Sequence, residues 1–137
     1  MIIPLLKGLK LTLGRFFSRP ITIQYPEQKV PPAPRWRGIQ YFDKDEQGKT
    51  RCVACGLCMA VCPSQCIYIE TAEDEKGKRY PLTYELDASR CIFCGFCEEA
   101  CPVKAIFMGK TYEWVEGDRR LFLMTTEKLL EEKKFNP

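Results

Sequence analysis

The feature that most restricts the fold of this chain is a cysteine-rich run that occurs twice. The first copy spans residues 51–63 and the second spans residues 90–102, and both read C-x2-C-x2-C-x3-C-P. An arginine precedes each run, and a glycine follows the second cysteine of each. Self-similarity at a constant offset indicates two copies of one structural unit. The sequence therefore predicts a domain with a pseudo-two-fold internal repeat.

The spacing of the cysteines indicates the kind of site that they form. In the bacterial iron–sulfur run, the first three cysteines wrap one cubane cluster and the fourth ligates the other cluster. This pattern predicts two 4Fe–4S clusters with crossed ligation. The ligands of the first cluster would be Cys52, Cys55, Cys58 and Cys101. The ligands of the second cluster would be Cys91, Cys94, Cys97 and Cys62.

Two other uses of cysteine fit the sequence less well. The chain has nine cysteines and no histidine, so the commonest nitrogen ligand of zinc, haem and copper is missing. A structural zinc site would more often show two C-x2-C pairs separated by 15–20 residues. Disulfides need an oxidising compartment, and the first residues are interrupted by lysines rather than forming a secretory signal. We expect reduced thiols that bind iron.

The ninth cysteine, Cys66, is not expected to be a ligand. Its counterpart in the second copy is Ala105, and a position that alanine can fill has no need of a thiolate. We interpret Cys66 as a small buried apolar residue. The alternative role is a redox-active or substitute ligand.

Gly56 and Gly95 lie within the two cysteine loops. Because glycine has no β-carbon, it allows the backbone to approach cluster sulfur closely.

The segments around the repeat predict an α+β, ferredoxin-like domain over residues 44–110. Residues 67–71 and 82–86 read as short strands joined by a polar turn at 73–78. Two further strands are expected at 38–42 and 105–108. Together they would form two short hairpin-like pairs, which with two short helices surround the clusters.

The N-terminal segment, residues 1–19, predicts a basic amphipathic helix. From residue 5 onward its leucines and phenylalanines recur at helical spacing, it contains no acidic residue, and Pro20 should end it. Such a helix favours a membrane surface or a membrane-bound partner. Residues 1–40 carry seven basic side chains and one acidic one, whereas the remainder carries fourteen and seventeen. A basic arm on an acidic body suggests two different surroundings. No stretch reaches the roughly 20 apolar residues of a transmembrane helix.

Two segments outside the repeat should lie against partners. Residues 20–43 form a proline-rich, extended arm, because five prolines between positions 20 and 34 preclude a helix. Residues 111–137 form a partner-binding tail that contains Trp114 and ends in a helix expected over 126–134. Thr125 or Thr126 could cap this helix.

The chain resembles the two-cluster ferredoxin-like subunit of respiratory complex I, called NuoI in bacteria and TYKY in mitochondria. The resemblance rests on Arg51 to Cys55, on Arg90 to Pro102, on the arm from Arg19 to Pro26, and on the tail from Thr126 to Leu130. The cysteine pattern is shared by many ferredoxins, but its combination with the Thr-Ile-Gln-Tyr-Pro arm is much narrower. Cys66 departs from the alanine that is common at this position in the family.

The resemblance implies an electron relay in NADH:quinone oxidoreductase, a translocase of the respiratory chain. The subunit would sit in the peripheral arm at the cytoplasmic side of the inner membrane, with residues 1–19 against the membrane arm. Its clusters would pass electrons toward the terminal cluster and quinone, and the eight ligands carry over position by position. We expect no catalytic residue, no directly bound small-molecule substrate and no nucleic acid.

Alternatives to this function remain open on the sequence alone. The chain could be the equivalent subunit of a membrane-bound hydrogenase, an F420H2 dehydrogenase or a photosynthetic NDH-1 complex. A free ferredoxin is a further alternative, although it would hardly need the arm and the amphipathic helix. A zinc-stabilised scaffold is the alternative without redox chemistry.

Overall fold

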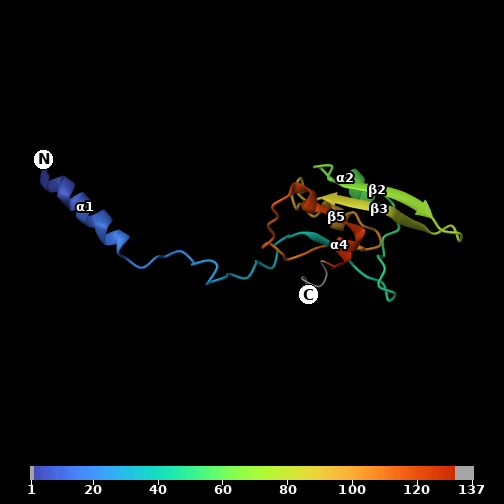
Figure 1. Ribbon diagram of the computed structural model, residues 1–137, viewed down its shortest axis with the longest axis horizontal. Coiled ribbons are helices and arrows are strands. Elements are labelled where there is room, and N and C mark those ends of the chain that lie inside the picture. Colours follow the sequence, from blue (N-terminus) through green and yellow to red (C-terminus); the bar gives the residue numbers. More distant parts are fainter. Residues whose placement is uncertain (1, 132–137) are drawn as a thin grey trace. The chain divides into compact units, whose positions relative to one another are not determined.

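The structure, a computed structural model, describes residues 2–131. The chain divides into two compact units, residues 1–32 and 33–137 (Figure 1). None of the helices within residues 2–131 has the length and hydrophobicity that crossing a bilayer requires.

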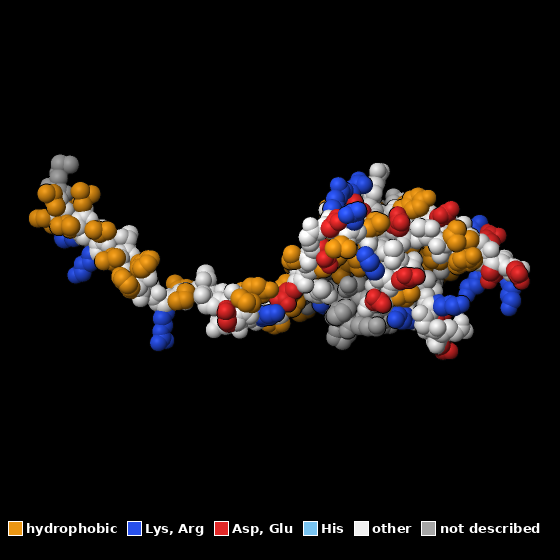
Figure 2. Space-filling view, viewed as in Figure 1, with side chains coloured by type: hydrophobic (Ala, Val, Ile, Leu, Met, Phe, Trp, Pro, Cys, Tyr) orange, Lys and Arg blue, Asp and Glu red, His pale blue; other side chains and the backbone are white. Residues whose placement is uncertain are grey.

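The first unit contains one helix, α1 (Ile2–Phe16), and none of its residues is buried. It ends three residues short of residue 19, where the predicted helix ends. Both the N–H and the Oγ of Ser18 donate to the carbonyl of Arg15, at 3.2 and 2.8 Å, which satisfies an acceptor of the last helical turn. Apolar side chains line the length of α1, and its basic side chains project from another side (Figure 2). Residues 17–39 contain no helix or strand.

The second unit contains two small antiparallel sheets. Strand β1 (Gln40–Phe42) pairs with β4 (Ile106–Met108), so the predicted strands near 38–42 and 105–108 are partners. Strands β2 (Ile67–Glu73) and β3 (Arg79–Asp87) form a long hairpin, and the polar turn between them lies where the sequence placed it. The β1–β4 pair is therefore not a hairpin, since its strands come from opposite ends of the domain.

Two short helices follow the two cysteine loops. They are α2 (Leu57–Val61) and α3 (Phe96–Glu99). Each begins directly after a glycine in the left-handed conformation, Gly56 with φ 78° and Gly95 with φ 82°. A β-carbon is disfavoured at such torsions, so glycine lets the chain turn sharply from loop into helix.

The core lies between the two sheets and the cysteine loops. Its largest fully buried side chains are Tyr84, Phe42, Leu86, Ile106 and Leu129. The rings of Phe42 and Tyr84 meet edge to face with centroids 4.7 Å apart, which joins β1 to β3. Cysteines from both loops pack against this cluster, so the core continues into the site.

The C-terminal segment folds partly onto this domain. A 3-10 helix, η1 (Arg119–Phe122), leads into β5 (Leu123–Thr125), which adds a third strand beside β3, and then into α4 (Thr126–Glu131). Met124 and Leu129 are buried in the core. Part of the apolar surface that we expected to face partners is thus covered by the chain itself. The last predicted helical residues, 132–134, lie outside the described residues.

Candidate metal centre

The two cysteine loops adopt the same backbone torsions at matching positions. Ala54 (φ 49°) corresponds to Phe93 (φ 54°), and Gln65 (φ 48°) corresponds to Lys104 (φ 47°). A positive φ is costly for residues that carry a β-carbon, so the surrounding structure must hold it. The N–H of Ala54 donates to the Cys52 sulfur at 3.4 Å. The N–H of Phe93 donates to the Cys91 sulfur at the same distance, so each loop wraps around its first cysteine.

The loops bring cysteines of different copies together. One cavity is lined by Cys62 of the first copy and by Cys91, Cys94 and Cys97 of the second, and Cys66 lines it as well. In the other direction, the thiols of Cys101 and Cys55 lie close enough to Cys52 to raise its pKa, although burial is the larger cause. Cys58 lies within electrostatic reach of Cys52 and Cys55. The structure thus brings Cys62 to the second loop and Cys101 to Cys52, so each of these two cysteines lies beside cysteines of the other copy.

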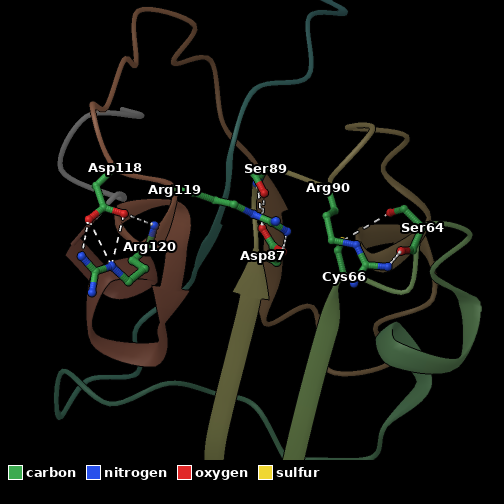
Figure 3. Close-up of polar contacts among 8 residues, drawn as sticks. All are labelled: Ser64, Cys66, Asp87, Ser89, Arg90, Asp118, Arg119 and Arg120. Atoms are coloured by element: carbon green, nitrogen blue, oxygen red, sulfur yellow. Dashed lines mark hydrogen bonds and ion pairs between the residues drawn. The ribbon is translucent and has the colours of Figure 1, made fainter.

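Basic side chains tie the second cysteine loop to other segments of the domain. Arg90, which directly precedes Cys91, donates to the carbonyl of Ser64 at 3.4 Å and so ties the second loop to the turn after Cys62 (Figure 3). Arg37 donates to the carbonyl of Cys94 and lies 3.6 Å from Glu99. No local sequence pattern indicates the role of Arg37, because its partners lie 57 or more residues away along the chain.

The thiols at the centre are hard to ionise in the metal-free chain. Burial raises the pKa of Cys58 to about 11 and that of Cys97 to about 12. Both thiols are therefore protonated at neutral pH until a metal replaces the proton, so loading must release protons. Neutral thiols can be buried at little cost, whereas metal-bound thiolates share their charge with the metal. The donor set, eight cysteine sulfurs from the two copies at the edge of an apolar core, fits two iron–sulfur clusters.

Comparison with known proteins agrees with this chemistry. Residues 51–105 match the family model described as a 4Fe–4S dicluster domain. NADH-quinone oxidoreductase subunit I 1 of Geobacter sulfurreducens is 46% identical over 133 residues, which are 97% of this chain and 100% of the relative. Subunit I 2 of Rhizobium meliloti is 50% identical over 127 residues, which are 92% of this chain and 68% of the relative. The chain belongs to the NADH-quinone oxidoreductase subunit I family.

A solved structure extends the comparison to another respiratory complex. A chain of the membrane-bound sulfane sulfur reductase, an archaeal respiratory membrane complex, is 29% identical to this subunit I family member, with a TM-score of 0.53. The match covers 82% of this chain and 58% of that chain. The dicluster domain of the subunit I family carries two 4Fe–4S clusters, which confirms the predicted cofactors, and its mixed helix and sheet structure agrees with the predicted fold class.

Cys66 lines the same cavity as Cys62 and the cysteines of the second loop in this family member. It is 6% exposed, and its sulfur is 3.5 Å from that of Cys62. Burial raises the pKa of Cys66 to about 12. Burial also acts to raise the pKa of Cys62, but hydrogen bonds from Cys66 and Ser64 outweigh it and lower that pKa. Of the two neighbours, Cys62 is therefore the one that forms a thiolate more readily.

The substitution Cys66→Ala is expected to leave both clusters in place. Alanine occupies the matching position 105, which is fully buried, so the smaller side chain is compatible with this backbone. We expect unchanged iron content and a loss of stability of about 1 kcal/mol from the lost contacts. Iron analysis and thermal unfolding of the variant measure both. Loss of half of the iron would instead identify Cys66 as a ligand.

Proposed function

We propose that this chain is the electron-relay subunit of a membrane-associated NADH:quinone oxidoreductase. In this role it passes electrons one at a time through two 4Fe–4S clusters toward the terminal cluster and quinone. The proposal is supported by the proximity of Cys62 to the second loop and of Cys101 to Cys52, in a chain that aligns with subunit I relatives over nearly its whole length. The chain does no bond chemistry of its own in this account.

We assign the ligands to two sets that each combine both repeats. The first set is Cys52, Cys55, Cys58 and Cys101, and the second is Cys91, Cys94, Cys97 and Cys62. The cavity that Cys62 shares with the second loop supports this assignment. So does the proximity of Cys101 to Cys52. The matching torsions of the two loops support the pseudo-two-fold repeat.

The clusters supply one-electron chemistry when they are bound, and the chain supplies their surroundings. Its cysteines fix the positions of the two clusters. The buried side chains of Ile67, Leu86 and Ile106 exclude water from the inner side of the loops. Excluding water lowers the local dielectric, which sets the reduction potential and favours transfer between buried centres. Cys55 is exposed, so the first site reaches the surface at that loop.

We further propose four functional segments with the boundaries that the sequence predicts. Residues 44–110 form the cluster domain, residues 20–43 an arm along partner subunits, and residues 111–137 a tail whose exposed side chains meet partners. Residues 1–19 bind the membrane surface or the membrane arm. Side chains in the tail that are exposed, such as Val115 at 91% and Leu121 at 47%, support contacts between the tail and partner subunits. The assembly would lie peripherally on the cytoplasmic side of the membrane.

A related complex with another electron donor is the second candidate. The likeness to a subunit of a sulfane sulfur reductase complex supports it, because this kind of chain also occurs in assemblies not named for NADH. The donor is bound by other subunits, so the relay described here would work in either assembly.

The proposed function is tested by isolating the assembly that contains this chain. A tagged full-length chain should co-purify with the NADH-oxidising and membrane subunits, and NADH should reduce its clusters within the turnover time of the complex. Rapid-freeze EPR measures the reduction. Co-purification without any NADH-oxidising subunit, and clusters that NADH leaves oxidised, would favour the second candidate.

The crossed ligand assignment makes a specific prediction for Cys101→Ser. Serine is a poorer ligand than a thiolate, so the variant should alter or lose the cluster bound by Cys52, Cys55 and Cys58, although these residues lie far away along the chain. EPR spectroscopy of the reduced protein should show one changed signal and one native signal. Cys62→Ser is the matched control, because it should alter the other signal. A change confined to the cluster of Cys91, Cys94 and Cys97 in the Cys101 variant would contradict the crossing.

A further inference from the structure

Gln40 is the one polar or charged side chain that the described core buries, with 2% of its surface exposed. It lies in β1, well before the first cysteine loop along the chain. The Nε2 of Gln40 donates to the hydroxyl oxygen of Tyr84 at 2.9 Å. The thiol of Cys97 donates to the Oε1 of Gln40 at 3.1 Å. Both ends of this buried amide are therefore hydrogen-bonded.

Tyr84 continues the connection to Cys58 of the first loop. Its side chain is 1% exposed in β3, and its hydroxyl lies close enough to the Cys58 thiol for each group to shift the pKa of the other. The buried line Cys97–Gln40–Tyr84–Cys58 thus ends on the third cysteine of each repeat. These two cysteines belong to different ligand sets, so the line joins the two cluster sites.

Binding of the clusters changes the hydrogen bonds that this buried line can form. A cysteine bound to iron has no proton, so the sulfurs of Cys58 and Cys97 then only accept hydrogen bonds. An amide offers an oxygen at one end and N–H groups at the other, and a tyrosine hydroxyl offers one proton. In one arrangement, the amide N–H of Gln40 donates to the Cys97 sulfur. The amide oxygen of Gln40 then accepts a hydrogen bond from the Tyr84 hydroxyl, which no longer donates to Cys58. In the other arrangement, the Tyr84 hydroxyl donates to the Cys58 sulfur and accepts from the amide N–H of Gln40, and the amide oxygen faces Cys97.

We propose that Gln40 and Tyr84 are positioning residues that form a reversible hydrogen-bond bridge between the two clusters and donate to one ligand sulfur at a time. The proposal rests on the ligand sets of the proposed function. A reduced cluster carries one more negative charge, so a donated hydrogen bond favours reduction and raises the potential of the cluster that receives it. The bridge turns toward the cluster that holds the electron and away from the other, which disfavours reduction of both together.

Two conservative substitutions test the two ends of the bridge separately, one at the donor to Cys58 and the other at the donor to Cys97. Tyr84→Phe deletes the hydroxyl that serves Cys58, so the first cluster should become harder to reduce while the second does not. Gln40→Met deletes the amide that serves Cys97 and frees Tyr84 for Cys58, so the second cluster should become harder to reduce while the first does not. Each loss should be roughly tenfold in the reduction equilibrium, which is about 59 mV for a one-electron couple.

The test is an EPR-monitored redox titration of the full-length chain loaded with iron and sulfide, with the signals assigned by Cys101→Ser. Tyr80→Phe, which removes a hydroxyl from an exposed position of the same strand, is the control and should move neither potential. Opposite selectivity of the two bridge variants is the expected result. A merely structural role would instead move both potentials together, and that result, or two unchanged potentials, overturns the bridge.

The wild-type protein provides a second measurement that needs no variant. When glutamine side chains are labelled with 15N at the amide, pulsed EPR should detect a 15N coupling to the cluster of Cys91, Cys94 and Cys97. Absence of that coupling overturns the proposal even if the Gln40 variant fails to load. Native iron content with unshifted potentials would reject the bridge alone, whereas absence of both cluster signals from the wild-type chain would reject the proposed function.

Discussion

Removal of the bound iron with a chelator is expected to abolish the tertiary structure of residues 33–131. The core has few large, fully buried side chains, and the cysteine loops form one side of it. Structural zinc contributes about 10–16 kcal/mol in zinc-finger peptides, whereas the net stability of a whole domain is about 5–15 kcal/mol, so metal binding can supply most of the stability of a small domain. The folded loops also require positive φ torsions that are unfavourable for Ala54 and Phe93. Without the metal, few interactions remain to offset this cost, so we expect the loops to unfold.

Near-ultraviolet circular dichroism and the dispersion of amide NMR signals measure this loss. Readdition of iron and sulfide under reducing conditions should restore both signals, which distinguishes unfolding from damage. The hairpin of β2 and β3 should not survive alone, because isolated two-stranded hairpins are marginal in water. A chelated chain that still melts cooperatively at the temperature of the loaded protein would contradict this prediction.

Deletion of residues 1–19 is expected to detach the subunit from the membrane part of its complex and to leave both clusters assembled. The large apolar side chains of α1 are all more than half exposed, and isolated helices of about 12–15 residues are marginal in water. Burying a leucine or phenylalanine contributes roughly 1.5–3 kcal/mol when it is fully covered. Each basic side chain near an anionic surface adds about 1 kcal/mol. Quinone reduction by the complex should fall, while an artificial donor should still reduce the clusters.

The helix itself offers a matched pair of point variants. Leu9 belongs to the apolar face, whereas Leu11 lines a groove with Lys7, Lys10 and Arg15 on the other face. The two leucines are similarly exposed, at 61% and 69%. Leu9→Glu should release the chain from vesicles that contain anionic lipid, and Leu11→Glu should do so much less. Sedimentation with the vesicles measures both. Equal release would show that the helix does not bind through its apolar face.

The cluster domain was predictable because its signals are local. The glycine and cysteine spacing of each run determines a loop and a helix start within about ten residues, and the same torsions recur at Gly56 and Gly95. The β-branched and aromatic residues of 67–71 and 82–86 predicted two strands, which the structure extends to 67–73 and 79–87. The ends were misplaced because backbone pairing continues past the β-branched and aromatic residues.

The parts that sequence reasoning missed depend on contacts between distant segments. Strand β5 has three residues and forms only because β3 offers a free edge, so nothing in Leu123–Thr125 alone predicts it. The burial of Leu129 likewise depends on the return of the tail to β1 and β3. The role of Gln40 had one local signal, because it is a single amide within the apolar run of residues 38–42. Its hydrogen-bond partners could not be predicted, because they lie 44 and 57 residues away along the chain.

The most direct test of the account is the iron and acid-labile sulfide content of the full-length chain, measured together with its EPR spectrum after reduction. Two cubane clusters require about eight iron and eight sulfide atoms per chain and two interacting tetranuclear signals. That result would support two four-cysteine sites in one relay. Zinc in place of iron, or about four iron atoms with one signal in the intact chain, would contradict it.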